Sequence, residues 1–293
     1  MFRNIFYTKL LEDYYPKYKE HPLIPDVLFI CIDYLCEDSE DFYTHGMYVN
    51  GLKHGWWKVW WENGNLRNSV LYREGKKCSL EIQMYPNGRM HKKGKYMNGK
   101  KYGRWCDWWE SGNPLCCGLY SDNKKNGELV YWHYNGCVQS TENYVMGKKY
   151  GNYKLWWENG MKKEFGYYAN DKKIGKWEYW DNTGKKKSTC GYVNGKKHGI
   201  CEIYWDNGNI HKRGKFINGI KHGNCEEWNR FGKQTIIGYY HKGKRHGKWS
   251  EWSYYRDNGE DRVTYRTGNY LDSRRVGLWR VWDNNSFLAE KVY

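Results

Sequence analysis

Short runs rich in aromatic and β-branched residues are separated by turn residues along most of the chain. The stretch Tyr192–Gly208, which reads Y-V-N-G-K-K-H-G-I-C-E-I-Y-W-D-N-G, shows the pattern clearly. Each run is about seven to nine residues long and contains many Trp, Tyr, Val and Ile residues, which favours strands over helices. The sequence therefore predicts two short antiparallel strands and two turns per unit.

The unit repeats with a fixed period. A glycine follows each Lys-Lys pair, and we number the repeat from this frame glycine as position 0. Successive frame glycines stand 24 residues apart, at Gly103, Gly127, Gly151, Gly175, Gly199, Gly223 and Gly247, and the frame extends back to Gly55 with Ser79 as the one substitute. A fixed period between 20 and 50 residues is typical of arrays in which each unit stacks on its neighbours. We expect an elongated antiparallel meander.

Asn-Gly pairs mark the turns. At positions +8 and +9 they are Asn63-Gly64, Asn87-Gly88, Asn135-Gly136, Asn159-Gly160 and Asn207-Gly208. Both central residues of a type I′ turn need a positive φ, so these pairs predict type I′ hairpins. A second turn follows at Asn98-Gly99, Asn194-Gly195 and Asn218-Gly219.

Aromatic residues recur at fixed positions. Position +5 holds Trp60, Trp108, Trp132, Trp156, Trp180, Trp228 and Trp252, and position +17 on the returning strand holds Tyr72, Tyr96, Tyr120, Tyr144, Tyr168, Tyr192, Phe216 and Tyr240. Equivalent residues of successive hairpins lie roughly 9 to 10 Å apart, so aromatic ladders should follow the sheet. Tryptophans at +2 have the opposite parity to those at +5. Either both faces carry aromatic residues or each strand holds a bulge.

These repeats resemble MORN repeats, in the variant with an N-G-K-K-x-G-x-W core, as in Y-M-N-G-K-K-Y-G-R-W from Tyr96 to Trp105. The resemblance covers about five sixths of the chain. It implies an all-β fold: an elongated single-layer antiparallel meander of about nine or ten hairpins with a groove. Members of that family serve as scaffolds, membrane-associated modules or peptide-binding troughs.

Two regions depart from the repeat. Residues 1–45 precede the array at 46–293, and Pro25–Glu37 reads as a helix with proline in its first turn. Residues 23–35 resemble the opening helix of an F-box, which docks onto a ubiquitin-ligase linker protein; a helical cap over the first open strand is the other interpretation. Near the C-terminus, six additional residues between Gly247 and Gly277 predict an insertion at 253–272, a longer loop or bulge.

The net charge of +16 is concentrated in lysine doublets before the frame glycines. The central ones are Lys100-Lys101, Lys124-Lys125, Lys148-Lys149, Lys172-Lys173 and Lys196-Lys197. A row of this kind along one edge of the sheet is suited to binding an anionic surface. The alternative is that these turn residues are solvated and discourage association between sheet edges.

The ten cysteines fall at scattered frame positions without a C-x-x-C pair. Cys201 and Cys225 occupy equivalent positions, roughly 9 to 10 Å apart, which is too far for a disulfide. With a charged N-terminus and no signal peptide, the sequence predicts reduced thiols in an intracellular, cytoplasmic protein. Any membrane contact should be peripheral, because no apolar run approaches spanning length.

Catalytic and cofactor motifs are not evident. The segments from Gly94 to Lys100 and from Gly238 to Lys244 resemble a P-loop, but the required Ser or Thr and the following helix are missing. His54, His198, His222 and His246 share position −1 and stand too far apart to converge on a metal. We expect a non-enzymatic protein without cofactors or metal.

The sequence favours a scaffold that holds a protein or peptide partner in an aromatic groove with a basic rim. Its partner-binding residues would be Trp108, Trp132, Trp156, Trp180, Tyr120, Tyr144 and Tyr168. The first alternative is peripheral binding to anionic phospholipid through the lysine doublets. Nucleic acid is a less favoured partner, because the basic and aromatic residues do not form one groove-sized patch. A ubiquitination adaptor using residues 23–35 is the remaining hypothesis.

Overall fold

The computed structural model describes residues 41–293, and all the regular elements in this range are β-strands. The strands are β1 (Asp41–Val49), β2 (Leu52–Trp61), β3 (Leu66–Arg73), β4 (Lys76–Met84), β5 (Met90–Met97), β6 (Lys100–Trp108), β7 (Pro114–Ser121), β8 (Lys124–Trp132), β9 (Val138–Val145), β10 (Lys148–Trp156), β11 (Lys162–Ala169), β12 (Lys172–Trp180), β13 (Lys186–Val193), β14 (Lys196–Tyr204), β15 (Ile210–Ile217), β16 (Ile220–Trp228), β17 (Gln234–His241), β18 (Lys244–Asp257), β19 (Glu260–Leu271), β20 (Arg274–Asp283) and β21 (Ser286–Val292).

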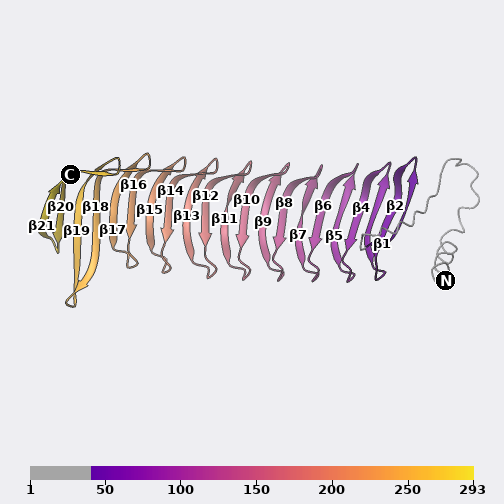
Figure 1. The fold of residues 1–293 in the computed structure, drawn as a ribbon, viewed down its shortest axis with the longest axis horizontal. Coiled ribbons are helices and arrows are strands. Elements are labelled where there is room, and N and C mark those ends of the chain that lie inside the picture. The colour runs from indigo at the N-terminus through magenta and orange to yellow at the C-terminus, as the bar shows by residue number, and fades with distance from the viewer. Residues whose placement is uncertain (1–40) are drawn as a thin grey trace, which may run out of the picture.

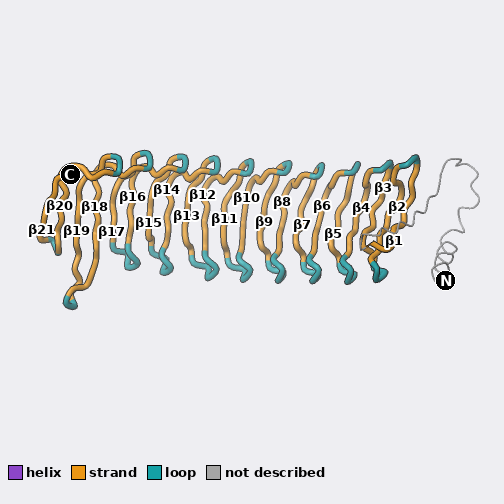
Figure 2. The backbone as a smooth tube through the Cα atoms, viewed as in Figure 1, coloured by secondary structure: helices purple, strands orange, loops and turns teal. Residues whose placement is uncertain are grey.

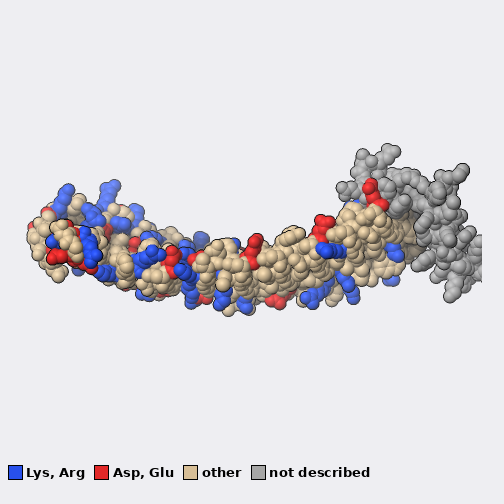
Figure 3. All heavy atoms as spheres, turned by 90° about the horizontal axis from the view of Figure 1, so that it is seen from below, with Lys and Arg blue, Asp and Glu red and all other residues tan. Residues whose placement is uncertain are grey.

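Each strand pairs antiparallel with the next along the chain, so the 21 strands form one open sheet (Figure 1). At about 4.8 Å per strand, the sheet is roughly 95 Å long. The turns line its two long edges (Figure 2), and the molecule is gently bowed along its length (Figure 3). The predicted all-β single-layer antiparallel meander is confirmed.

A bulge at each frame glycine sets which side chains share a face. In β14, Lys197 pairs with Tyr192 and Cys201 with Cys190. The residues around Gly199 therefore bulge out opposite a single residue of β13. Gly199 has a φ of 78°, and Ser79 takes the same conformation with a φ of 71°. A second register shift follows later in each hairpin except β18–β19, as between Tyr179 and Trp180. Of the two alternatives for the tryptophans, the first holds: aromatic residues occupy both faces, with those at +2 and +5 on opposite sides. The strands are also bulged, but the bulge at the frame glycine precedes position +2 and does not bring the two tryptophans to one face.

The type I′ prediction, made for the Asn-Gly pairs at positions +8 and +9, is wrong, and the second set of turns adopts that type instead. Asn98 and Gly99 have φ values of 51° and 78°, as a type I′ turn requires. At positions +8 and +9, only the glycine, such as Gly64, has a positive φ. There the Asn63 side chain instead accepts a hydrogen bond from the Asn65 amide at 3.0 Å. This Asx turn satisfies the backbone without placing asparagine in the left-handed region.

The turns are also hydrogen-bonded from one repeat to the next. On one edge, the Asn63 amide donates to the Pro86 carbonyl, and Asn87, Asn135, Asn159 and Asn207 make the equivalent bond. On the other edge, the backbone amide of Gly195 donates to the Lys173 carbonyl, in a pattern that recurs along the sheet. Each hairpin is therefore joined to its neighbours through its tips as well as its strands.

The predicted insertion lengthens two strands and forms no long loop. Residues Lys244–Asp257 and Glu260–Leu271 pair without interruption from Gly247↔Tyr270 to Asp257↔Glu260. The β18–β19 hairpin consequently projects beyond its neighbours (Figure 1). At the other end, β1 begins at Asp41, inside the segment expected to precede the sheet. The helix expected at Pro25–Glu37 and the F-box resemblance at 23–35 lie outside the described residues.

The prediction of reduced thiols is wrong for four cysteines. Disulfides join Cys106 to Cys117 and Cys190 to Cys201, with Cα separations of 4.2 and 4.1 Å. Each pair stands directly opposite on adjacent strands. The sequence argument compared equivalent positions two strands apart and so missed cross-strand neighbours. Cys78, Cys116, Cys137 and Cys225 are free thiols.

Candidate functional site

A row of mostly buried residues crosses the sheet, and we call it the spine. It consists of positions +2 and +15, which alternate from strand to strand. Five times a glycine lies beneath the tryptophan of the next strand: Gly46 and Trp57, Gly94 and Trp105, Gly166 and Trp177, Gly238 and Trp249, Gly268 and Trp279. A Cβ on Gly166 would lie 2.2 Å from the Trp177 ring, so the glycine is a steric requirement. Trp177 is fully buried although the sheet has a single layer.

The second lysine of each doublet covers the spine. Lys173 Nζ lies 3.9 Å from the Trp177 ring centroid, and Lys101 Nζ lies 4.3 Å from that of Trp105. Lys125, Lys149 and Lys197 make equivalent contacts with rings. Such cation–π contacts stabilise the fold by about 0.5–2 kcal/mol each. These five predicted anion-binding residues therefore lie on the face that carries the spine, which we call the spine face.

The predicted tyrosines lie on the same face. Tyr168 packs edge-on against Trp177, with ring centroids 5.0 Å apart, and Lys149 stands over its ring. Tyr120 lies beneath Lys101, and buried Tyr144 donates a hydrogen bond to Glu142. Burial is the largest cause of the raised pKa of Tyr120, Tyr144 and Tyr168. All three hydroxyls are uncharged at neutral pH and serve the internal packing of the sheet.

Carboxylates complete the spine face. Glu81, which occupies a spine position, is 1% exposed and pairs with Lys77 at 2.6 Å. Glu142 pairs with Lys149, and Glu164 with Lys173. Three of the lysines that cover the spine, Lys77, Lys149 and Lys173, are thus paired with carboxylates on the same face.

The first lysines of the doublets are differently placed. Lys100, Lys124, Lys148, Lys172 and Lys196 are all exposed along one edge of the sheet. Lys100 has a carboxylate partner, Asp122 at 3.3 Å. Within residues 41–293 the other four form no ion pair. This half of the predicted basic row remains available to an external anion.

The predicted tryptophans lie on the opposite face, away from the predicted tyrosines. Trp156 and Trp180 each pack against Phe165, with both pairs of ring centroids 5.3 Å apart. By strand alternation, Trp108 and Trp132 occupy the same face, and all four tryptophans are half-buried. The seven predicted partner-binding residues therefore do not line one groove.

The face with these tryptophans also carries a band of exposed apolar residues. The band lies beside the first lysines, at positions −1, +1, +16 and +18, and we call this side the band face. Its members are Trp56, Met97, Tyr102, Leu119, Val145, Tyr150, Tyr167, Val193, Ile200, Ile217, Tyr239 and Leu278, which are between 36% and 61% exposed. Sequence reasoning missed the band because its members are spread over four repeat positions, none of which holds an apolar residue in every repeat.

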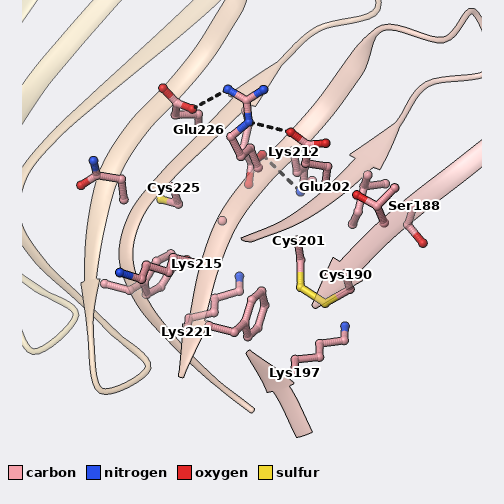
Figure 4. A pocket seen from close by; sticks show the side chains of 18 of the residues that line it. Ser188, Cys190, Lys197, Cys201, Glu202, Lys212, Lys215, Lys221, Cys225 and Glu226 are labelled. Carbon is pink, nitrogen blue, oxygen red and sulfur yellow. Dashed lines mark hydrogen bonds and ion pairs between the residues drawn. A yellow bond between two sulfur atoms is a disulfide. The ribbon is translucent and has the colours of Figure 1, made fainter. Parts of the chain in front are cut away.

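A hollow of about 390 Å³ opens on the spine face across β12 to β17 (Figure 4). It lies between the Cys190–Cys201 disulfide and the Cys225 thiol, with Lys197 and Lys221 at one end. Desolvation on burial raises the pKa of Cys225 to about 11, so the thiol is protonated at neutral pH. The hollow occurs where position +2 holds cysteine in two successive repeats, at Cys201 and Cys225, with Gly214 between them in the spine.

The position −1 histidines do not build a metal centre. His241 stands between His222 and His246, with ring centroids 5.3 and 5.6 Å away. Nevertheless, no cluster of three or more His, Cys, Asp or Glu side chains within residues 41–293 has the arrangement to hold a metal ion. The prediction had overlooked His241, which comes from position +18.

Comparisons with known proteins add no family to this description. No family model matches the chain, and a search of curated proteins finds no match. In the part of the chain described by the structure, no helix has the length and apolar character needed to cross a bilayer.

Proposed function

We propose that this protein is a non-catalytic scaffold that binds a polypeptide partner along its band face. The observation that carries the proposal is the band itself. Contiguous exposed apolar surface is characteristic of interaction sites, and aromatic residues are enriched in such interfaces. On the spine face, by contrast, most rings and charged groups contact one another within the sheet.

Three exposed band residues on β7, β10 and β11 suggest where the partner binds. Tyr150 and Tyr167 are 52% and 51% exposed, and Leu119 is 47% exposed. They lie beside exposed Lys124, Lys148 and Lys172. A partner that offers apolar side chains with acidic neighbours would complement this surface in both shape and charge.

The test is affinity capture from host extract with the double variant Tyr150→Ser and Tyr167→Ser. Its matched control is Tyr134→Ser with Phe231→Ser, because those rings are 64% and 84% exposed but lie outside the band. We expect the band variant to lose the partners captured by the wild-type chain, while the control retains them. Equal recovery by the folded band variant would disprove the proposal.

A second candidate function is peripheral binding to anionic lipid. The specific observation in its favour is the row of exposed first lysines beside exposed apolar side chains, of which Lys124, Lys148, Lys172 and Lys196 form no ion pair within residues 41–293. Each lysine near an anionic membrane contributes about 1 kcal/mol, and the attraction is screened by salt. Co-sedimentation with phosphatidylserine vesicles should weaken with salt and with Lys148→Glu plus Lys172→Glu. Insensitivity to both would exclude this candidate.

A further inference from the structure

The spine contains a gap above Gly214. Spine neighbours across β14, β15 and β16 are Cys201, Gly214 and Cys225, in direct register. A Cβ on Gly214 would meet nothing within 4 Å, whereas one on Gly166 or Gly238 would run into an indole ring. Gly214 is therefore a spine glycine that lacks its aromatic cover.

The filled units show what normally occupies this space. Trp249 rests on Gly238, between Tyr240 and Tyr270 at ring centroid distances of 5.3 and 5.7 Å. Arg245 covers the indole at 4.6 Å. The tryptophan thus has a glycine beneath it, an aromatic ring on either side and a cation above it.

The hollow retains all these parts except the tryptophan. Gly214 is the floor, Phe216 and Tyr240 occupy the flanking position +17, and Lys221 is the cation. Lys221 Nζ lies 4.8 Å from the Tyr240 centroid. Because Cys225 stands where the indole would be attached, the cradle is assembled without its ring. A volume of about 390 Å³ falls within the range of ligand sites.

The two lysines beside the hollow, Lys197 and Lys221, are also more exposed than the cations at the same position of the other repeats. Among the residues at position −2 in the described chain, Lys197 and Lys221 are exposed, while the others are half-buried. Their ring contacts are with Phe216 and Tyr240. The nearby Glu227 carboxylate is paired with Lys212 at 3.2 Å. Two ammonium groups consequently face the opening with no carboxylate partner within residues 41–293.

We propose that this hollow binds the aromatic side chain of a polypeptide partner, with tryptophan as the preferred residue and acidic residues beside it. The indole would stack on Gly214 between Phe216 and Tyr240, beneath Lys221. Neighbouring carboxylates would pair with Lys197 and Lys221. This site lies on the opposite face from the band, so it goes beyond the proposed function, and the band variant should leave it intact.

The experiment measures the anisotropy of a labelled peptide, acetyl-Glu-Asp-Trp-Asp-Glu-amide, with the full-length protein. Cys225→Trp should fill the cradle from within and weaken binding at least tenfold. Gly214→Leu provides a second way to fill it, because nothing lies near the position of its Cβ. The control is Cys137→Trp, which adds an indole at an exposed cysteine outside the hollow and should leave binding unchanged.

Peptide variants test the chemistry of the occupant. Replacing tryptophan by alanine should abolish binding, and replacing the acids by glutamine should weaken it at least fivefold. The proposal is overturned if the wild-type chain does not bind the peptide, if both filled variants bind it as the wild type does, or if the alanine peptide binds equally. Equal binding by N-acetyltryptophan amide alone would also overturn it, because the acidic neighbours would then contribute nothing.

Discussion

At the scale of the residue, the sheet depends on glycine and tryptophan acting as a pair. A single-layer sheet cannot bury a large ring between two layers, so it must bury the ring against its own backbone. Gly166 permits this because the Trp177 indole lies where a side chain would begin. Lys173 and Tyr168 then cover the exposed side of the ring. As a result, this thin protein contains residues that are as buried as those in the core of a globular protein.

Gly166→Ala tests the steric part of this pair. The new methyl group would overlap the Trp177 ring, so we expect a loss of about 1–3 kcal/mol in the free energy of unfolding. Gly214→Ala is the matched control, since it adds the same atom at an equivalent position with open space around it. Urea unfolding of both variants makes the comparison. Equal stability of the two would contradict the packing described for the spine.

Ser79→Gly tests the frame position itself. Ser79 has a φ of 71°, a conformation that costs a residue with a Cβ roughly 1 kcal/mol relative to glycine. We expect the variant to be more stable by about that amount. Ser69→Gly, in the middle of β3, should instead lose stability, because glycine there only adds freedom to the unfolded chain. Thermal unfolding distinguishes the two directions.

At the scale of the element, the hairpin is the unit that the sequence specifies best. Turn residues and strand residues are local signals, so the period, the strand order and the antiparallel pairing could all be predicted. The turn type at Asn63-Gly64 could not, because the asparagine side chain makes contacts in the next repeat. The sequence also did not fully predict which residues share a face of the sheet. That depends on bulges, which cannot be read from the alternation of residues along the chain.

The candidate sites were less predictable than the fold. The lysine doublets look alike in the sequence, but their two members differ in the structure: Lys172 is exposed, whereas Lys173 lies over a ring. One usable signal was overlooked: glycine and the tryptophan that covers it are always 11 residues apart, as in Gly94 and Trp105. The same spacing joins Cys190 to Cys201 and leaves Gly214 opposite Cys225. Reading the chain at that interval would have exposed both the disulfide and the gap.

Each of the two disulfides joins two adjacent strands. Both close loops between residues 11 positions apart, for which loop entropy predicts a stabilisation of about 3 kcal/mol. Cys190→Ala with Cys201→Ala should therefore unfold β13 and β14 more readily, as hydrogen exchange would show. Cys137→Ala should not. If reductant leaves exchange in the wild-type chain unchanged, the bond contributes no such stability.

At the scale of the whole molecule, the tyrosines make the array sensitive to alkali. Burial raises the pKa of Tyr192 to about 12 and also raises that of Tyr96, Tyr131 and Tyr153. A raised pKa in the folded state means that the neutral hydroxyl stabilises the fold. That stability is complete below the unfolded pKa of about 10 and is lost as the pH rises through the folded value.

We therefore expect the unfolding free energy to fall steeply between about pH 10 and pH 12. Circular dichroism and tyrosinate absorbance, recorded on the same samples, would show ionisation coinciding with loss of the sheet. Smooth ionisation of all tyrosines near pH 10 in a still-folded sheet would contradict the burial described for the spine face.

The regular stacking of hairpins also limits the shape of any long partner. Successive hairpins advance by roughly 9.6 Å, while every seventh residue of an α-helix advances by about 10.5 Å. A straight helix would therefore drift out of phase by half a step after about five hairpins. Every third residue of an extended chain advances by roughly 10 Å, which stays nearly commensurate over the whole array. A partner that contacts many successive hairpins should therefore be an extended segment with a three-residue motif. A helical partner should contact only a few hairpins at a time.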